Sequence, residues 1–363
     1  MLSQKEQKKM ADAEDLAHLV GVIEDIRFPS NTRFQFPSKV GGLPAWMTPE
    51  SIPIVECDSC SRTMSFLLQI YAPDEENTSA FHRSVLVFVC TSCRCFLKTF
   101  RVQLPLENEY YPSKPISSDC VPIHDEALSN QCCENCGMLK HSRSACHPLP
   151  EYGLTIDELD EVVFGEEDED DDDACEDEEI EQEKMDQICN ASEMTLDESE
   201  ADLFNEFTET ALEADATFRI FKKFVEEAPS DHVVYYSIGG SPVWITDENQ
   251  IPGSPPDCEH CGACRRFEFQ IQPQLIYHLM KRLRGFPMNA APFEWGVVAI
   301  YTCSANCSSG GDYREEFVYN QLEPAEWLEL GARKKVDFSQ EKAGAAPKIA
   351  EVETTSEDEG EWM

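Results

Sequence analysis

One ordered motif occurs twice in this chain. Residues 41–73 read GGLPAWMTPESIPIVECDSCSRTMSFLLQIYAP, and residues 239–273 read GGSPVWITDENQIPGSPPDCEHCGACRRFEFQIQP. Each copy begins with a Gly-Gly-x-Pro-x-Trp turn, continues to a C-x-x-C pair and ends in an apolar run that contains a glutamine. The matched positions are Gly41, Gly42, Pro44, Trp46, Cys57, Cys60, Phe66, Gln69 and Ile70 with Gly239, Gly240, Pro242, Trp244, Cys258, Cys261, Phe267, Gln270 and Ile271. This shared order indicates an internal duplication, so the fold must accommodate two similar units.

Alternating apolar residues predict that both units are built mainly from β-strands. The expected strands are 20–28, 64–72, 84–90 and 96–104 in the first unit, and 232–244, 266–272, 296–303 and 315–322 in the second. Helical spacing predicts helices within 201–229 and 273–284. We therefore expect an α+β, mainly β fold. In it, two pseudo-repeated β-sheet lobes with a few peripheral helices pack in pseudo-twofold fashion and are joined by a disordered acidic linker.

Changes in composition divide the chain into segments. Residues 157–186 contain nineteen Asp or Glu residues and one Lys, which leaves too little apolar surface to build a core. The expected segments are a disordered leader (1–19), an N-terminal β lobe (20–110), a cysteine-containing loop region (111–150), an acidic disordered linker (151–200), a C-terminal β lobe (201–330) and a disordered tail (331–363).

The charge balance limits the classes of partner. The 363 residues include 70 acidic and 29 basic side chains, a net charge of −41. Such a chain is repelled by phosphate backbones, so we expect no direct nucleic-acid binding and favour basic proteins as partners. The sequence shows neither a secretory signal nor an apolar run long enough to cross a membrane. We therefore expect a location in the cytosol or nucleus, where its 17 cysteines stay reduced.

Two sets of cysteines occupy matching places in the two units. A second closely spaced pair follows a strand in each copy, and paired strands can bring two such pairs together as a tetrahedral zinc site. The predicted sets are Cys57, Cys60, Cys90 and Cys93, with Cys95 as a substitute, and Cys258, Cys261, Cys303 and Cys307, with Cys264 as a spare. We expect structural zinc, about two ions per chain. The alternatives are buried thiols without metal, or a redox pair, which would need a cysteine at a helix N-terminus rather than before a strand.

Two further features have less distinctive patterns. Cys133, Cys136, Cys146 and His147 could hold another zinc ion, but this spacing has no counterpart elsewhere in the chain. In the repeated turn, the glycines allow positive φ and the proline stiffens the exit, so Gly41, Gly42, Pro44 and Trp46 and their partners Gly239, Gly240, Pro242 and Trp244 are interpreted as structural. The alternative is that the two tryptophans are stacking platforms for a base or a peptide aromatic. No motif of a known catalytic centre is present, so we do not expect an enzyme.

The motif strings together resemble the programmed cell death protein 2 family. VGGLPAWM, CDSCSRTMSFLLQIYAP and FHRSVLVFVC are similar to its N-terminal half. FRIFKKFVEEAPSDHVVYYSIGGSPVW, CEHCGACRRFEFQIQPQL and EWGVVAIYTCSANC are similar to its C-terminal domain. Some members carry a MYND-type zinc finger between the halves, and the cysteines here do not reproduce it. The chain therefore looks more like the programmed cell death protein 2-like branch; the yeast 20S rRNA accumulation protein is a relative.

This resemblance implies a dedicated chaperone and assembly factor. Family members bind a newly made, basic small-subunit ribosomal protein (uS5) and support maturation of the pre-40S particle, in some cases with nuclear export. The expected location is the cytoplasm, with shuttling to the nucleus; the export-like patterns 154–164 and 203–212 are weak. The acidic residues Asp170, Asp171, Asp172 and Asp173 are candidates for partner binding, or else part of a solvating spacer. The alternative function is a zinc-stabilised protein–protein adaptor or regulator in signalling or transcription.

Overall fold

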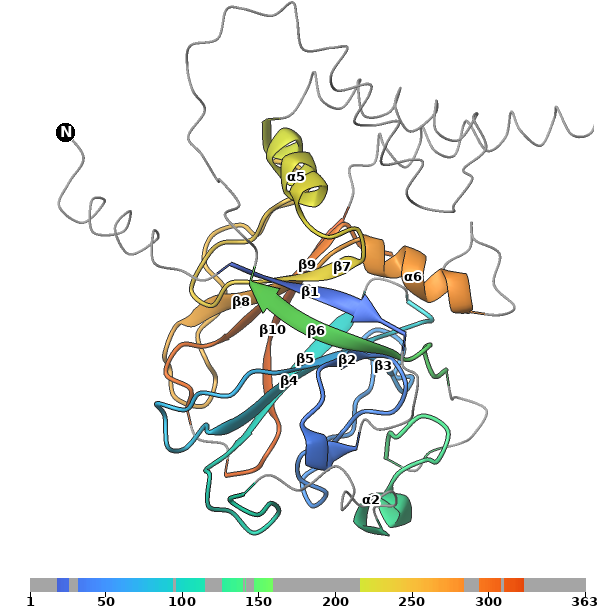
Figure 1. Cartoon of the computed structure of the whole chain (residues 1–363), viewed down its shortest axis with the longest axis vertical. Coiled ribbons are helices and arrows are strands. Elements are labelled where there is room, and N and C mark those ends of the chain that lie inside the picture. The colour runs from blue at the N-terminus through green and yellow to red at the C-terminus, as the bar shows by residue number, and fades with distance from the viewer. Residues whose placement is uncertain are drawn as a thin grey trace, which may run out of the picture. The chain divides into compact units, whose positions relative to one another are not determined.

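Ten antiparallel β-strands form one closed barrel in the computed structural model (Figure 1). The structure describes residues 18–25, 32–93, 96–114, 126–139, 141, 147–158, 216–283, 294–307 and 310–322. The first repeat supplies β2 (Lys39–Val40), β3 (Ser65–Tyr71), β4 (His82–Val89) and β5 (Leu97–Leu104). The second supplies β7 (His232–Tyr236), β8 (Arg265–Ile271), β9 (Val297–Cys303) and β10 (Arg314–Gln321).

The strands of the two repeats follow one another in opposite directions around the barrel. Around the barrel the order is β2-β3-β4-β5-β10-β9-β8-β7, so the last strands of the two repeats meet in the middle of this series. There, Glu315 and Glu316 of β10 pair with Phe100 and Thr99 of β5. Two strands outside the repeats, β1 (Leu19–Glu24) and β6 (Tyr152–Glu158), lie between β7 and β2 and close the ring.

The mainly β class predicted from the sequence is confirmed, but the two units do not form separate lobes. Each repeat alone would be a four-stranded sheet with two edges that lack hydrogen-bond partners. Pairing β5 with β10, and β2 and β7 with the added strands, satisfies all four edges. The strand β6 also lies inside the segment expected to be an acidic linker. Residues 152–158 therefore belong to the barrel, whereas 159–215 lie outside the described residues.

A β-bulge occurs at the same place in each repeat. The register of β3 on β4 shifts between Phe66 and Leu68, and that of β8 on β9 shifts between Phe267 and Phe269. The extra residue is Leu67 in the first repeat and Glu268 in the second, and both are fully buried. Matching bulges support the internal duplication, because a bulge depends on local backbone geometry that related sequences share.

Apolar side chains fill the two faces of the sheet. One cluster contains the alternate residues Val85, Val87 and Val89 of β4 together with Phe269 and Ile300 of the second repeat. Because it joins strands across the ring, this cluster fills the barrel interior. A second cluster covers the opposite face of the first repeat and contains Trp46, Leu86, Phe88, Phe100, Val102 and Cys133.

Buried ion pairs also connect charged side chains inside the barrel, two of them between the repeats. Arg83 of β4 makes two hydrogen bonds of 2.6 Å to the carboxylate of Glu268, and neither side chain is exposed to solvent. Arg101 of β5 lies 2.7 Å from Glu316, whose other oxygen lies 3.0 Å from Arg265. The pKa of Glu268 would be raised by burial, but Arg83 and the hydrogen-bonding hydroxyls hold it below its ordinary value.

Among the described residues, three α-helices lie outside the barrel wall: α2 (Glu126–Gln131), α5 (Ala216–Glu227) and α6 (Gln274–Arg282). A short 3-10 helix, η1, spans Arg33–Gln35. Helix α5 buries Phe218, Phe221 and Phe224 at helical spacing, and Phe224 packs edge-on against Tyr235 of β7. Helix α6 lies beside β7 (Figure 1). In the part of the chain that the structure describes, no helix combines the length and apolar character that crossing a membrane requires.

Candidate metal centres

The hairpins β3–β4 and β8–β9 bring each pair of cysteine pairs together. Cys57 and Cys60 precede β3, and Cys90 and Cys93 follow β4, whose last residue Val89 pairs with Ser65 at the start of β3. In the second repeat, Cys303 at the end of β9 pairs with Arg265 at the start of β8. Antiparallel pairing therefore closes the long sequence gap between the two pairs of each set.

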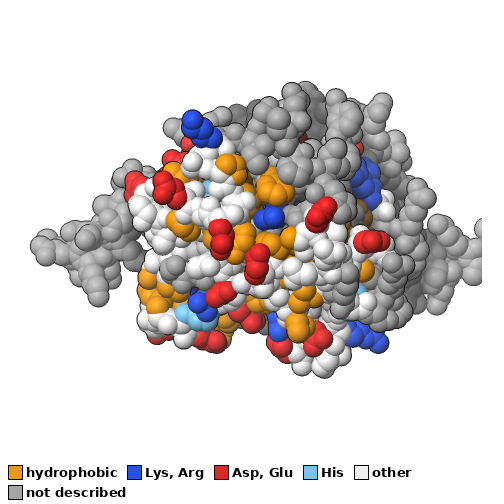
Figure 2. All heavy atoms as spheres, turned by 90° about the horizontal axis from the view of Figure 1, so that it is seen from below, with side chains coloured by type: hydrophobic (Ala, Val, Ile, Leu, Met, Phe, Trp, Pro, Cys, Tyr) orange, Lys and Arg blue, Asp and Glu red, His pale blue; other side chains and the backbone are white. Residues whose placement is uncertain are grey.

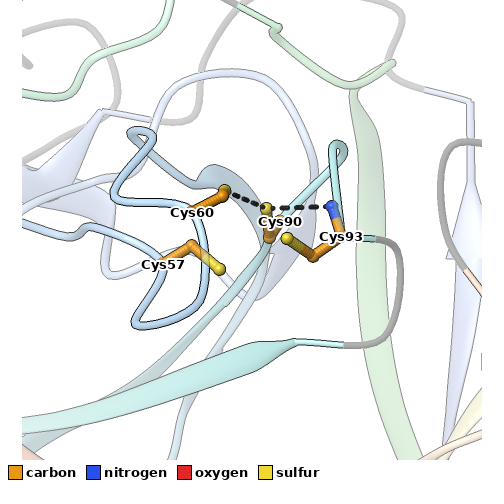
Figure 3. A group of neighbouring side chains, drawn as sticks. All are labelled: Cys57, Cys60, Cys90 and Cys93. Carbon is orange, nitrogen blue, oxygen red and sulfur yellow. Dashed lines mark hydrogen bonds between the residues drawn. The ribbon is translucent and has the colours of Figure 1, made fainter.

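The first set has the spacing of a tetrahedral metal site. Its four sulfur atoms lie within 4.8 Å of one another, and the Sγ atoms of Cys60 and Cys90 are 3.6 Å apart. Four thiolates at 2.3 Å from a zinc ion would be separated by about 3.8 Å. Figure 3 shows the four side chains converging from the two loops. The residues present thus fit a four-coordinate ion with no open position.

The second set repeats this geometry. The Sγ atoms of Cys258 and Cys307 are 3.8 Å apart, and those of Cys261 and Cys303 are 3.5 Å apart. The predicted spare, Cys264, is exposed and contacts Ser304 instead of joining the set. Cys95, the predicted substitute in the first set, lies outside the described residues. Each C-x-x-C pair leads into a strand, so neither has the helix N-terminus that activates a redox thiol.

In each set the surroundings lower the pKa of one thiol and raise the pKa of two others. A hydrogen bond from the backbone of Arg62 lowers the pKa of Cys60 to about 7, whereas burial raises the pKa of Cys90 to about 12. Burial opposes ionisation of Cys258, but backbone N–H groups of the turn and neighbouring thiols lower its pKa to about 7. A divalent cation would be needed to keep all four thiolates together in so small a volume.

The second set is connected to the interior ion pairs. Arg101 from the first repeat donates to the carbonyl of Cys307 at 3.2 Å and to its sulfur at 3.6 Å. The backbone N–H of Cys303 donates to Glu316 at 3.1 Å. Groups of this kind orient the ligands of a metal site and balance the charge of its thiolates.

A buried glutamine explains why the turn and the strand recur together. In the first repeat, Gln69 of β3 accepts a hydrogen bond from the N–H of Ala45 (2.9 Å), next to Trp46. In the second, Gln270 of β8 accepts from the N–H of Val243 (2.7 Å) and donates back to its carbonyl (2.9 Å). The Gly-Gly-x-Pro-x-Trp turn is therefore held by the glutamine of its own repeat.

The two tryptophans of the turns have different surroundings. Trp46 is 1% exposed, stacks on Phe88 and donates its indole N–H to the carbonyl of Gly137 at 2.7 Å. Trp244 is only half-buried and meets Tyr319 edge-on, with ring centres 5.9 Å apart. The glycines differ likewise: Gly41 and Gly42 lie against Pro150 and Glu151, whereas Gly239 has open space where a side chain would begin.

The remaining predicted residues fall in two groups. Cys133 and Cys136 lie together, but His141 rather than His147 joins them. The carbonyl of His147 instead accepts a hydrogen bond from Ser65, and Cys146 lies outside the described residues, as do Asp170, Asp171, Asp172 and Asp173. Of the export-like patterns, Leu154 is buried in β6, and 203–212 is not described.

Comparison with known proteins places this architecture in a family. Residues 18–118 match the family model described as "Programmed cell death protein 2, N-terminal domain". Residues 215–322 match "Programmed cell death protein 2, C-terminal putative domain". Rat programmed cell death protein 2 is 32% identical over 330 residues, which cover 79% of this chain and 91% of the rat protein. The chain belongs to the programmed cell death protein 2 family.

Both named branches of the programmed cell death protein 2 family are represented among the relatives. Mouse programmed cell death protein 2 is 33% identical over 336 residues, covering 79% of this chain and 91% of its own length. Human programmed cell death protein 2-like is 26% identical over 344 residues, covering 80% and 91%. The branch assigned from the missing MYND array stays a prediction, and these identities do not favour it. No solved structure matches the chain.

Sequence reasoning missed several buried charged residues and one candidate metal ligand. The burial of Arg83 on β4, Arg101 on β5, Arg265 and Glu268 on β8, and Glu316 on β10 was not predicted. For Arg83 the available signal was its period-2 register with Val85 and Val87 in HRSVLV. Glu268 gave no such signal, because it is the extra residue of the β8 bulge. His141 was missed although it follows Cys136 at a spacing that metal-binding loops use.

Proposed function

We propose that this protein is a dedicated chaperone and assembly factor for a newly made, basic small-subunit ribosomal protein (uS5), and that it thereby supports pre-40S maturation. The observation that carries the proposal is the distribution of charge. Among the described residues, the buried cations are Lys39, Arg83, Arg101 and Arg265, whereas the buried carboxylates are Glu268 and Glu316. Folding thus removes more positive than negative charge from the surface of a chain whose net charge is already −41.

The surface fits a partner that is both basic and prone to aggregate. Figure 2 shows one face on which acidic side chains are spread among apolar ones. Exposed acids of the first repeat include Glu50, Glu75, Glu76, Glu107 and Glu109, and exposed apolar groups include Ile54, Phe96 and Leu106. Opposite charge accelerates encounter with a cationic client and shields it from nucleic acid, and apolar groups can cover surface that the ribosome later buries.

The chemistry of the protein would be binding alone. In this proposal the two four-cysteine sets each hold one zinc ion, which fixes a C-x-x-C turn to the end of a hairpin and takes part in no reaction. The protein turns over no substrate, binds the pre-40S particle only through its client and works in the cytoplasm with shuttling to the nucleus. The family assignment and the acidic surface support this proposal.

Co-expression tests it directly. uS5 would be produced with and without this chain, and its soluble fraction measured, with an unrelated basic protein of similar net charge as a control for non-specific shielding. We expect this chain to raise the soluble fraction of uS5 but not that of the control protein. We also expect the complex to weaken as the salt concentration rises. A soluble fraction of uS5 that does not depend on this chain would refute the proposal. A native pull-down dominated by signalling or transcription proteins, without ribosomal proteins, would favour the adaptor function.

A charge-neutralised variant would locate the client surface. Replacing the acids of 166–173 by Gln and Asn tests the run that contains Asp170–Asp173, and replacing Glu75, Glu76, Glu107 and Glu109 by Gln tests the barrel. If the run is only a solvating spacer, the first variant keeps uS5 soluble and the second does not.

A further inference from the structure

The turn at Cys133 has the same backbone as the two turns that carry the four-cysteine sets. In the first set, the N–H of Cys57 donates to the carbonyl of Arg62 (2.9 Å), and its own carbonyl accepts from Ser61 (2.7 Å). In the second, Cys258 bonds in the same way to Ala263 and Gly262, both at 2.8 Å. In the third, Cys133 bonds to Met138 (2.7 Å) and Gly137 (2.8 Å). The residue after the second cysteine has positive φ in all three: 54° at Ser61, 72° at Gly262 and 69° at Gly137.

A further backbone contact strengthens the match. Residues just before and after the turn form an isolated antiparallel bridge, Glu56 with Thr63 at the first turn and Cys132 with Leu139 at the third. In both turns the two bridging residues lie directly before the first cysteine and directly after the last residue of the turn. Such a turn aims the sulfur atoms of both cysteines at one point, which is how short C-x-x-C loops present two thiolates to a metal.

A third donor completes the cluster. The ligand atoms of Cys133, Cys136 and His141 lie within 4.8 Å of one another, and Cys136 Sγ is 3.1 Å from His141 Nε2. Both cysteines are buried and the histidine is half-buried. Two thiolates and an imidazole suit zinc and similar soft divalent cations. Cys146 comes five positions after His141 in the sequence and lies outside the described residues.

The position of this turn indicates what a metal ion there would do. The carbonyl of Gly137 accepts the indole hydrogen bond of Trp46, and Gly137 lies against Pro44 of the same repeated turn. Met138 is 2% exposed and belongs to the apolar cluster of the first repeat, against which Leu139 packs. Trp46 and Met138 are therefore part of the protein's own core, and Trp46 is not accessible for stacking on a base.

We propose that Cys133, Cys136 and His141 bind a third metal ion of the zinc class, and that this ion holds residues 132–139 as a cover over Trp46. The second repeat has a half-exposed Trp244 at the matching place, which shows how the turn looks without such a cover. The metal ion therefore stabilises a feature that only the first repeat possesses. This inference does not depend on the identity of the client.

Metal analysis of the full-length chain tests the site. We expect about three zinc ions per chain, falling to about two in Cys136→Ser and in His141→Asn. His141→Cys, which replaces one zinc ligand by another, should keep about three. The neighbouring buried Cys132→Ser is the matched control and should also keep three. A count that is the same in the wild type, Cys136→Ser and His141→Asn would overturn the site.

Hydrogen exchange tests the cover. In His141→Asn, we expect residues 44–48 and 132–139 to lose protection, whereas the turn at 257–264 keeps it and shows that the barrel is folded. Loss of one metal ion with unchanged exchange at residues 44–48 would overturn the proposed role over Trp46. Recovery of protection in His141→Cys would show that the effect comes from metal binding rather than from the substitution itself.

Discussion

The two repeats share their framework but differ in charge where they face each other. Both have the bulge, the glutamine that holds the turn and the four-cysteine set. Inside the barrel, however, the first repeat contributes the cations Arg83 and Arg101, and the second contributes the carboxylates Glu268 and Glu316. Two copies of the first repeat placed together would bury arginines without counter-ions. The difference therefore favours pairing of unlike repeats within one chain over pairing of like repeats between chains.

A second difference concerns the outer face. The turn of the first repeat is covered by residues 132–139 and by Pro150 and Glu151, and the same turn in the second repeat is more open. A duplicated element can thus keep its backbone while its surroundings change, because the hydrogen bonds from Gln69 and Gln270 are internal to each repeat. Substitutions at matched positions can measure each of these differences.

The largest effect is expected from breaking one end of a buried ion pair. Glu268→Gln leaves the charge of Arg83 in the interior without its counter-ion and should lower the free energy of unfolding by about 3–5 kcal/mol. Removing both charges, as Arg83→Met with Glu268→Leu, should recover most of this loss. Urea unfolding of the single and double variants measures both values.

An exposed pair on the same chain provides the control. Glu226→Gln breaks the ion pair with Lys222 on helix α5 and should cost less than about 1 kcal/mol.

The pKa of Glu268 is held below its ordinary value. The contribution of the ionised Glu268 to the free energy of unfolding is thus complete above the unfolded pKa of about 4.3. It is lost as pH falls through the pKa of the folded state. Equal costs for Glu268→Gln and Glu226→Gln would show that the interior pair does not join the repeats.

The glycines of the turns should give an intermediate effect and a clear contrast. A Cβ atom at Gly41 would lie 1.9 Å from the carbonyl oxygen of Pro150, and its φ is 60°. Gly239 has φ of 81° and open space. Gly239→Ala should cost about 1 kcal/mol for the left-handed backbone. Gly41→Ala should cost about 3 kcal/mol, because the clash is added to the same strain. Thermal or urea unfolding distinguishes them; equal costs would contradict the covered turn.

The tryptophans should show the smallest of the three contrasts. Trp46→Phe leaves the carbonyl of Gly137 without its indole donor in a buried site and should cost about 1–3 kcal/mol. Trp244→Phe keeps an aromatic ring beside Tyr319 at a half-exposed position and should cost less than about 1 kcal/mol. Chemical unfolding of the pair is the measurement. A larger loss in Trp244→Phe would indicate that its turn is covered as well.

Much of the fold could be predicted from local pattern. Period-2 alternation located eight strands, although β2 was too short and β6 too close to the acidic run to be recognised. The eight cysteines were located by their repeated spacing, and the hairpins bring them together. Helix α6 begins after Pro273, as predicted, because proline suits a first turn and the apolar residues Leu275, Leu279 and Met280 recur on one face.

What the sequence alone determined is local: which residues form strands, which turns carry cysteine pairs and that both features occur twice. Only the tertiary structure showed that β5 pairs with β10, that Arg83 meets Glu268 and that His141 rather than His147 joins Cys133 and Cys136. The physical reason is that periodicity and turn chemistry act over a few residues. Edge pairing and charge neutralisation instead depend on residues that the chain separates by more than a hundred positions.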